Sequence, residues 1–316
     1  RKMFLDKLCK TNPNLIQTAV HMHQQKQIMP DTYVVDVDQF IANAKAILQK
    51  ANGQNIELYY MLKQIGRNPY LAMELEKIGY KGAVVVDFKE AEVMMRNHLH
   101  IAHAGHLVQI PSMMINQLVK YGCDYITVYS YEKLVEVNEA AKKVGISQKI
   151  CVRVIGENDR IYSGQTAGFY LDQLEELVRK AKNLSHIEIA GVDNFPCFLY
   201  DEKTKKIEAQ ENLYTILKAK NILEGLGCRI QNVNAPSATC VHTLELMKHY
   251  PEITSAEPGH GLSGTTPYHV DHDTEEIPSI LYLSEVSHVL DNHAYIYGGG
   301  YYRRGHIQNA LVGTCY

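Results

Sequence analysis

The 316-residue sequence predicts an α/β protein, in which a (β/α)₈ TIM-type barrel is followed by a C-terminal antiparallel β domain. Short apolar runs alternate with longer amphipathic runs along most of the chain. The apolar runs are rich in β-branched residues, which is typical of strands buried on both faces. Eight such units follow one another, as in a TIM barrel. An open doubly wound sheet is the alternative, but no G-x-G-x-x-G follows the first strand.

The elements can be assigned in chain order. The stretch "DTYVVDVDQF" (residues 31–40) reads as a strand, and "VDQFIANAKAILQKA" (residues 37–51) has the apolar spacing of a helix. The eight barrel strands are then expected at residues 56–63, 82–87, 101–109, 124–130, 149–155, 187–195, 229–235 and 253–259. Helices between them include residues 69–80, 88–98, 130–145, 171–184 and 242–251. Ser130 and Asp172 are the expected caps of two of these helices.

The pattern divides the chain into a barrel and an extension. We expect the barrel at residues 30–265, with residues 1–29 and 266–316 forming a β-rich second domain or extension. After residue 265 short alternating strands appear, with a turn at "LDNHA" (residues 290–294). About 50 residues is little for a separate core. Either the N-terminal residues complete this domain, or the chain is cut short.

Composition excludes several classes of partner. The net charge of −3 gives no electrostatic reason for binding nucleic acid or acidic lipid. No apolar run approaches the ~20 residues of a membrane span, and the charged N-terminal stretch does not resemble a signal peptide. Seven cysteines at wide spacings, without a C-x-x-C, predict a reduced, cytoplasmic protein in which most cysteines are small core residues.

Polar residues close the apolar runs. Because barrel active sites lie at the C-terminal ends of the strands, these residues are expected to converge on one mouth. They are Lys63, Asp87, His106, Gln109, Ser130, Arg153, Asn194, Asn234, Ser237, Glu257, Gly259 and His260. In "LYYMLKQIGRNP" (residues 58–69) the apolar run ends in a single lysine, Lys63. A lysine amine that burial frees of its proton can form a Schiff base; the alternative is a lysine that extends to the surface.

Two glycine- and serine-containing turns fit an anion. In "SAEPGHGLSGTTP", Gly259 and Gly261 let backbone N–H groups approach a ligand, and "NAPSATC" supplies Ser237 and Thr239. Both turns follow strands seven and eight, where barrels commonly bind phosphate. An ordinary turn and an ordinary helix cap are the alternatives.

The histidines of "NHLHIAHAGHLV" and "YHVDHD" suggest metal ligands by type. No H-E-x-x-H or thiolate accompanies them, however, and alternation along a strand places neighbouring histidines on opposite faces. The sequence therefore predicts no metal site.

These residues resemble those of a known family. The chain is similar to fold-type III pyridoxal-phosphate (PLP) enzymes, the alanine-racemase-like barrels, over about residues 29–313. "YYMLKQIGRNP", "AHAGHLVQIP" and "AEPGHGLSGTTP" resemble the branch of YhfX-type predicted amino-acid racemases. The resemblance implies pyridoxal 5′-phosphate as the cofactor, bound as a Schiff base to Lys63. It also implies a set of cofactor contacts, namely Asn194, Asn234, Ser237, Glu257, Gly259 and His260.

The position of Glu257 divides that family. Alanine racemases carry an arginine there, whereas "AEPGH" is similar to the "EPGR" of basic amino-acid decarboxylases. A carboxylate keeps the ring nitrogen protonated and so makes the ring a stronger electron sink. By the same resemblance, Tyr297 or Tyr301 corresponds to the tyrosine base supplied by a partner subunit. Arg153 or Arg160 is a candidate for holding a substrate carboxylate.

The sequence thus predicts a PLP-dependent isomerase of amino-acid metabolism, a racemase that acts as a homodimer on a small-molecule amino acid. Lys63 would deprotonate Cα on one face, and Tyr297 or Tyr301 would act on the other. The alternatives are a PLP-dependent decarboxylase or other chemistry through a Cα carbanion, and a PLP-binding homeostasis protein without turnover. A metal-assisted hydrolase is a more distant alternative.

Overall fold

The computed structural model describes residues 4–299 and 310–313. The chain forms two compact units. The larger unit is Ile47–Gly259, and the smaller unit combines Arg1–Ala46 with His260–Tyr316. Among the described residues, no helix combines the length and apolar character that crossing a membrane requires.

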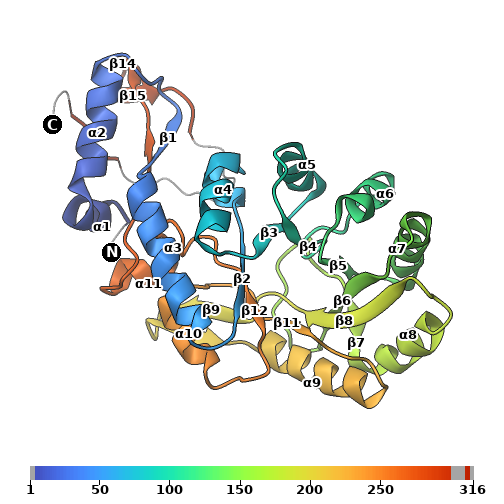
Figure 1. Ribbon diagram of the computed structural model, residues 1–316. Coiled ribbons are helices and arrows are strands. Elements are labelled where there is room, and N and C mark those ends of the chain that lie inside the picture. Colours follow the sequence, from blue (N-terminus) through green and yellow to red (C-terminus); the bar gives the residue numbers. More distant parts are fainter. Residues whose placement is uncertain (1–3, 300–309, 314–316) are drawn as a thin grey trace. The chain divides into compact units, whose positions relative to one another are not determined.

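The larger unit is a closed barrel of eight parallel strands, which confirms the predicted fold (Figure 1). Its strands are β2 (Glu57–Tyr60), β3 (Gly82–Val85), β4 (Ile101–Ala104), β5 (Tyr125–Val128), β6 (Gln148–Ile155), β8 (Ile187–Asp193), β11 (Asn232–Asn234) and β12 (Ser255–Ala256). Each strand pairs in parallel with the next, and β12 pairs with β2 to close the barrel. Their residues are almost entirely buried, as expected for strands without polar alternation.

Helices follow the barrel strands and surround them in Figure 1. They are α4 (Pro69–Ile78), α5 (Phe88–Arg96), α6 (Ser112–Tyr121), α7 (Tyr131–Val144), α8 (Leu174–Ala181), α9 (Glu211–Gly225) and α10 (Val241–Met247). Ser130 caps α7 as predicted, accepting a hydrogen bond from the N–H of Lys133. The prediction for Asp172 is wrong. It lies inside the 3₁₀ turn η2 (Leu171–Gln173), where the Gln173 side chain accepts from the Tyr170 N–H and so occupies the turn's start.

Several short secondary-structure elements lie in the loops of the barrel. Strand β7 (Phe169–Tyr170) pairs with the end of β6. Strands β9 (Phe198–Asp201) and β10 (Lys206–Ala209) form an antiparallel hairpin. The 3₁₀ turn η1 (Lys63–Ile65) follows β2 and ends at Gly66, whose φ of 70° suits glycine.

The N-terminal part of the smaller unit is helical, whereas a β-rich segment was expected there. Residues 1–29 were expected in a β-rich extension, yet they contain helices α1 (Phe4–Thr11) and α2 (Pro13–Gln24). The reason for α2 lies in the spacing of its buried residues Leu15, Ile16 and Ala19, which is helical. Leu8 of α1 packs with Leu15 and Ile16 in one apolar cluster. Pro13 at the first position of α2 and the Asn12 cap fix where that helix begins.

The β elements of the smaller unit are two antiparallel pairs. Strand β1 (Thr32–Val35) pairs with β13 (Ile280–Leu283), and β14 (Val286–Leu290) pairs with β15 (His293–Ile296). The predicted turn between the last two is confirmed, since Asp291 and Asn292 have φ values of 48° and 60°. Helices α3 (Val37–Asn52), which was predicted, and α11 (Pro267–Asp271) complete the elements.

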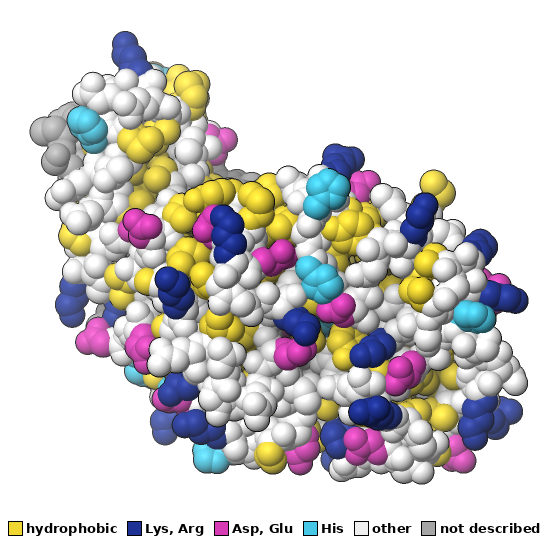
Figure 2. Space-filling model, in the orientation of Figure 1, with side chains coloured by type: hydrophobic (Ala, Val, Ile, Leu, Met, Phe, Trp, Pro, Cys, Tyr) yellow, Lys and Arg dark blue, Asp and Glu magenta, His cyan; other side chains and the backbone are white. Residues whose placement is uncertain are grey.

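The surface charges and the cysteines agree with what the composition predicts. Figure 2 shows basic and acidic side chains mixed over the visible face of the described residues, consistent with the net charge of −3. The six cysteines within the described ranges carry free thiols, and Cys123, Cys151, Cys197 and Cys240 are buried.

A buried carboxyl group lies at the start of α5. Glu90 is 1% exposed, and its Oε2 accepts a hydrogen bond from the Val86 N–H at 2.9 Å. Burial raises the pKa of Glu90 from 4.5 to about 7, although the Val86 N–H and the charges of Arg67 and Lys63 oppose the shift.

Glu90 should make stability depend on pH. Because the folded protein holds this proton more tightly than the unfolded chain, its contribution to the free energy of unfolding falls as pH rises from 4.5 to about 7. The Glu90→Gln variant should lack this fall, which amounts to at most about 1.4 kcal/mol per pH unit. Urea unfolding between pH 5 and 8 measures the difference. Glu92→Gln, on the same helix but partly exposed, is the control, and parallel curves for all three proteins would contradict the expectation.

Candidate active site

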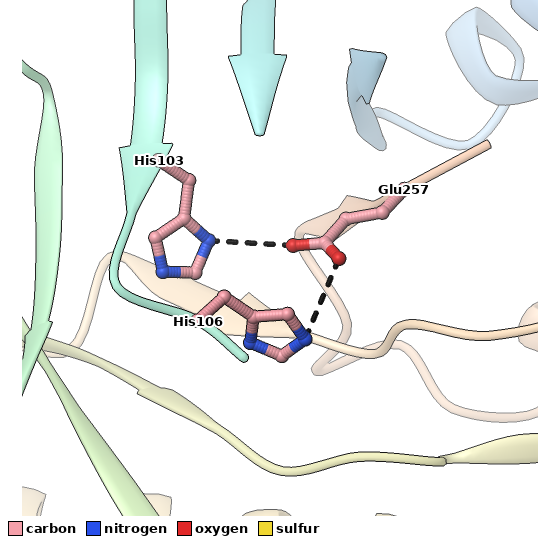
Figure 3. A group of neighbouring side chains, drawn as sticks. All are labelled: His103, His106 and Glu257. Carbon is pink, nitrogen blue, oxygen red and sulfur yellow. Dashed lines mark ion pairs between the residues drawn. The ribbon is translucent and has the colours of Figure 1, made fainter. Parts of the chain in front are cut away.

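Charged and polar side chains meet inside the barrel at the C-terminal ends of its strands. His103 lies on β4 and Glu257 directly after β12, and His106 follows β4 by two residues. Figure 3 shows both imidazole rings directed at the carboxylate of Glu257. His103 Nδ1 lies 3.3 Å from Oε1, and His106 Nε2 lies 3.5 Å from Oε2. Each carboxylate oxygen therefore has its own imidazole.

The two histidines share this interior because of Gly105. Strand alternation predicted that neighbouring histidines lie on opposite faces, and for this pair the prediction is wrong. Strand β4 ends at Ala104, and Gly105 has a φ of 84°, which turns the chain before His106. A Cβ at Gly105 would lie 2.7 Å from the Thr127 carbonyl oxygen, so the position admits only glycine without a shift of backbone.

A second carboxylate, Asp193 at the end of β8, faces the same histidines. Its Oδ2 accepts a hydrogen bond from Thr127 and lies 3.4 Å from His103 Nε2. Its Oδ1 lies 3.5 Å from His106 Nδ1 and 3.7 Å from Arg153 Nη1. His103, His106 and Asp193 are fully buried, and Arg153 is 4% exposed.

Charge pairing sets the protonation of this cluster. Burial alone would raise the pKa of Glu257, but the charge of His106 and the hydrogen bond with His103 outweigh it and lower the pKa. The same balance between burial and the two histidines holds the pKa of Asp193 well below its usual range. Burial opposes the charged form of His103, yet its bonds to Asp193, Cys151 and Glu257 raise its pKa well above the ordinary value. Both carboxylates are therefore anionic and His103 cationic near neutral pH.

Hydrogen-bonding capacity remains open at this mouth. Several buried polar atoms find no hydrogen-bond partner within the described part of the chain. They include both ring nitrogens of His106, Nε and Nη1 of Arg153, Oδ1 of Asp193, Oε2 of Glu257 and the hydroxyl of Thr239. Buried polar groups are usually satisfied, so such a group calls for a ligand.

Lys63 and Glu257 are brought to neighbouring strands. Strands β2 and β12 pair in parallel, and past their ends the Met61 N–H donates to the Pro258 carbonyl at 3.0 Å. Lys63 begins the turn that follows β2 and is partly buried. Residues from the two ends of the barrel sequence thus lie side by side because the barrel closes.

Asn234, at the end of β11, is part of the cluster. Its Nδ2 donates to Glu257 Oε1 at 2.5 Å, and its Oδ1 accepts from the Ser255 hydroxyl at 3.1 Å. Asn234 therefore orients Glu257.

The two turns expected to bind an anion differ in their backbone. Ser237 and Ala238 have φ values of 97° and 51°, and the buried hydroxyl of Thr239 follows them. A Cβ on Gly259 would lie 2.9 Å from Gln64 Nε2, so the chain passes close to that side chain. His260 is exposed and is the first residue of the smaller unit's second segment.

Asn194 has a different set of partners. Its Nδ2 donates to Asp159 Oδ2 at 2.5 Å, and its Oδ1 accepts from Asn212 and from the Phe195 N–H. These bonds tie the loop after β6 to the end of β8.

Three other predicted residues, Arg160, Asp87 and Gln109, have partners outside the cluster. Arg160 is exposed, and its backbone is bonded to Asn212. Tyr297 belongs to the smaller unit and is 48% exposed, and Tyr301 lies outside the described residues. Asp87 caps α5 and pairs with Arg67, and Gln109 accepts from the Tyr129 N–H.

Sequence reasoning missed Asp193 and Thr127. For Asp193 a signal existed, because it ends an apolar strand one position before Asn194, and adjacent strand residues point to opposite faces. For Thr127, a small β-branched residue inside a buried strand, the sequence offers no such signal.

Two other interpretations, a metal site in this cluster and an active site in a cavity elsewhere, have less support than an organic ligand at the strand ends. The ligand atoms of His103, His106 and Glu257 lie within 4.8 Å of one another, and such residues bind zinc in other proteins. Here each imidazole already faces a carboxylate at ion-pair distance, which accounts for the group without a metal ion. A cavity of about 650 Å³ lies at the other end of the barrel, lined by Glu57, Lys81 and Lys149 among others. Barrel chemistry occurs at the opposite, C-terminal face.

The strand-end cluster and barrel define a class of enzyme, and comparisons with known proteins agree. The chain matches the family described as alanine racemase, N-terminal domain, over residues 35–267, and YhfX-like, C-terminal domain, over residues 281–316. It is 46% identical over 312 residues to the uncharacterized protein YhfX of Escherichia coli K12, covering 99% of this chain and 80% of that protein.

Two solved structures share the fold. The chain superposes on AQ1208 of Aquifex aeolicus with a TM-score of 0.63 and 16% identity, covering 84% of this chain and 64% of that one. Diaminopimelate decarboxylase from Helicobacter pylori, complexed with L-lysine, gives a TM-score of 0.66 and 16% identity, with 87% and 72% coverage.

The protein is a fold-type III PLP-dependent enzyme. It belongs to the alanine racemase N-terminal domain family, and its cofactor is pyridoxal 5′-phosphate. The residues present fit this cofactor by type. A lysine amine, a buried carboxylate, a buried guanidinium and a buried hydroxyl suit its aldehyde, ring nitrogen, phenolic oxygen and phosphate respectively. The open hydrogen-bonding capacity of Glu257, Arg153 and Thr239 supports this fit.

The buried charges predict a contrast in stability. Asp193→Asn removes one partner of the buried cluster and should lower the free energy of unfolding by about 3–5 kcal/mol. Asp124→Asn removes a carboxylate of the half-exposed pair with His100 and should cost about 0–1 kcal/mol. Urea unfolding of both variants at pH 7 provides the measurement. Equal losses would show that the barrel cluster is not held by charge.

Proposed function

We propose that the protein is a PLP-dependent amino-acid racemase in which Lys63 holds the cofactor and acts at Cα. The observation that supports this most is the pairing of β2 with β12, which sets Lys63 and Glu257 at neighbouring strand ends. The match to the alanine racemase N-terminal domain over residues 35–267 supports a racemase within the wider class.

The residues have separate tasks. When bound, the cofactor supplies an electron sink that stabilises negative charge at the Cα of an amino acid. Lys63 Nζ takes the Cα proton on one face. Glu257 would hold the ring nitrogen of the cofactor, with Asn234 orienting the carboxylate. Arg153 has two guanidinium nitrogens without a hydrogen bond within the described residues. They would bind the phenolic oxygen of the cofactor at the C-terminal end of the barrel.

Inversion needs a second proton-carrying group on the opposite face. We assign it to Tyr297 or Tyr301 of a second copy of the chain, acting across a homodimer. The exposed side chain of Tyr297 is consistent with such a role. Ser237, Gly259 and His260 are assigned to binding the phosphate group of the cofactor. Asn194 is assigned to a cofactor contact beside them.

A decarboxylase is the second candidate. It is favoured by the sequence Glu257-Pro258-Gly259, because a carboxylate at this position makes a strong electron sink. Diaminopimelate decarboxylase shares the fold.

Lys63→Ala should abolish the absorbance band near ~420 nm that a lysine-bound cofactor gives. The loss follows because no other amine would replace Nζ. Lys81→Ala is the matched control, since Lys81 is a half-exposed lysine paired with Glu57 at the other end of the barrel. A band that persists in Lys63→Ala would refute the assignment of Lys63.

Turnover in D₂O separates the two reactions. A racemase exchanges the Cα hydrogen for deuterium while the carboxylate stays on the product, and each enantiomer yields the other. Mass spectrometry and chiral chromatography of a panel of D- and L-amino acids measure both. Release of CO₂ with loss of the carboxylate would support the decarboxylase instead.

A further inference from the structure

Glu257 is enclosed by groups that carry positive charge or donate hydrogen bonds. His103 Nδ1 faces Oε1 at 3.3 Å, and His106 Nε2 faces Oε2 at 3.5 Å (Figure 3). Asn234 Nδ2 donates to Oε1 at 2.5 Å. Only Oε2 lacks a hydrogen bond within the described residues, so it is the oxygen with capacity for a ligand.

His103 is hydrogen-bonded on its other side, whereas His106 lies near a second carboxylate without a hydrogen bond. His103 Nε2 lies 2.6 Å from the Thr127 hydroxyl, and Asp193 faces both rings at 3.4 and 3.5 Å. The two histidines and the two carboxylates form a closed ring of contacts, in which each imidazole lies between Glu257 and Asp193. Neither ring can turn away from Glu257 without leaving Asp193.

The charges around this loop offset one another. Asp193 and Glu257 are anionic, while His103 and Arg153 are cationic, so their formal charges cancel before His106 is counted. The Cys151 thiol beside His103 stays neutral, because burial raises its pKa. Glu257 is thus not an isolated anion, because an imidazolium lies within 3.3 Å of it.

We propose that His103 and His106 are positioning residues that weaken the hold of Glu257 on the cofactor's ring nitrogen. A carboxylate stabilises a protonated ring nitrogen by its negative charge, and an adjacent imidazolium offsets part of that charge. The nitrogen therefore gives up its proton at lower pH than it would beside a lone carboxylate. The inference rests on the proposed function in one respect, namely that Glu257 faces the ring nitrogen.

The consequence concerns the choice of reaction. With both histidines in place, the ring is a weaker electron sink than the carboxylate alone would make it. Less stabilised negative charge at Cα favours immediate return of a proton. The histidine pair thereby moves a site with a decarboxylase-like glutamate toward racemase chemistry.

The test measures the ring nitrogen directly, without substrate. Apoprotein is loaded with pyridoxal phosphate labelled with ¹⁵N in the ring, and the ¹⁵N shift is followed against pH in the wild type, His103→Gln and His106→Gln. Both variants should raise the midpoint by about one pH unit or more. His100→Gln, a half-exposed histidine beside β4 that pairs with Asp124, should leave it unchanged. Equal midpoints in all proteins, or a fall in the variants, would overturn the proposal.

A second measurement covers variants that do not fold. In wild-type protein labelled with ¹⁵N-histidine, cofactor loading should shift the ring signals of two solvent-protected histidines, and no shift would overturn the proposal. Raised midpoints in the variants without racemisation would support the effect of the histidines on the ring nitrogen, and would reject both the racemase and the consequence for the choice of reaction. Racemisation with unchanged midpoints would do the reverse.

Discussion

Two carboxylates, Glu257 and Asp193, lie in the barrel interior, where either alone would be strongly destabilising. They are tolerated because the barrel delivers cations and donors to them from other strands: His103 and His106 from β4, and Arg153 from β6. The pairing lowers the pKa of both groups and so keeps them ionised. It also keeps a carboxylate available at the strand ends, which is where the family binds its cofactor.

Closure of the barrel converts this pairing into a site. Lys63 follows the first barrel strand and Glu257 follows the last, and the pairing of β2 with β12 brings these two strand ends together. The histidines then change what Glu257 can do, because a carboxylate flanked by imidazoles presents less negative charge than the same residue alone. Stability and reactivity therefore depend on the same contacts, which explains why the cluster has buried charges where packing alone would prefer apolar side chains.

Sequence reasoning succeeded where local rules apply and failed where they end. All eight barrel strands were predicted, because β-branched runs buried on both faces are a local signal. The orientation of the side chains that follow the end of a strand was not predicted. Gly105 turns the chain so that His106 joins His103, against simple alternation, and Asp193 rather than its neighbour Asn194 faces the histidines. The helical start of the chain was missed because the helical spacing of Leu15, Ile16 and Ala19 was overlooked.

The sequence by itself determined the barrel, the family and the residue types of the site: a lysine after the first strand, a glutamate after the last, and one histidine on β4 with another just after it. These follow from periodicity and motif, which are properties of short segments. The tertiary structure alone decided which of these side chains meet, that each oxygen of Glu257 has its own imidazole, and that Asp193 completes the group. Such contacts join segments far apart in the chain, and their geometry exists only once the strands have closed into a barrel.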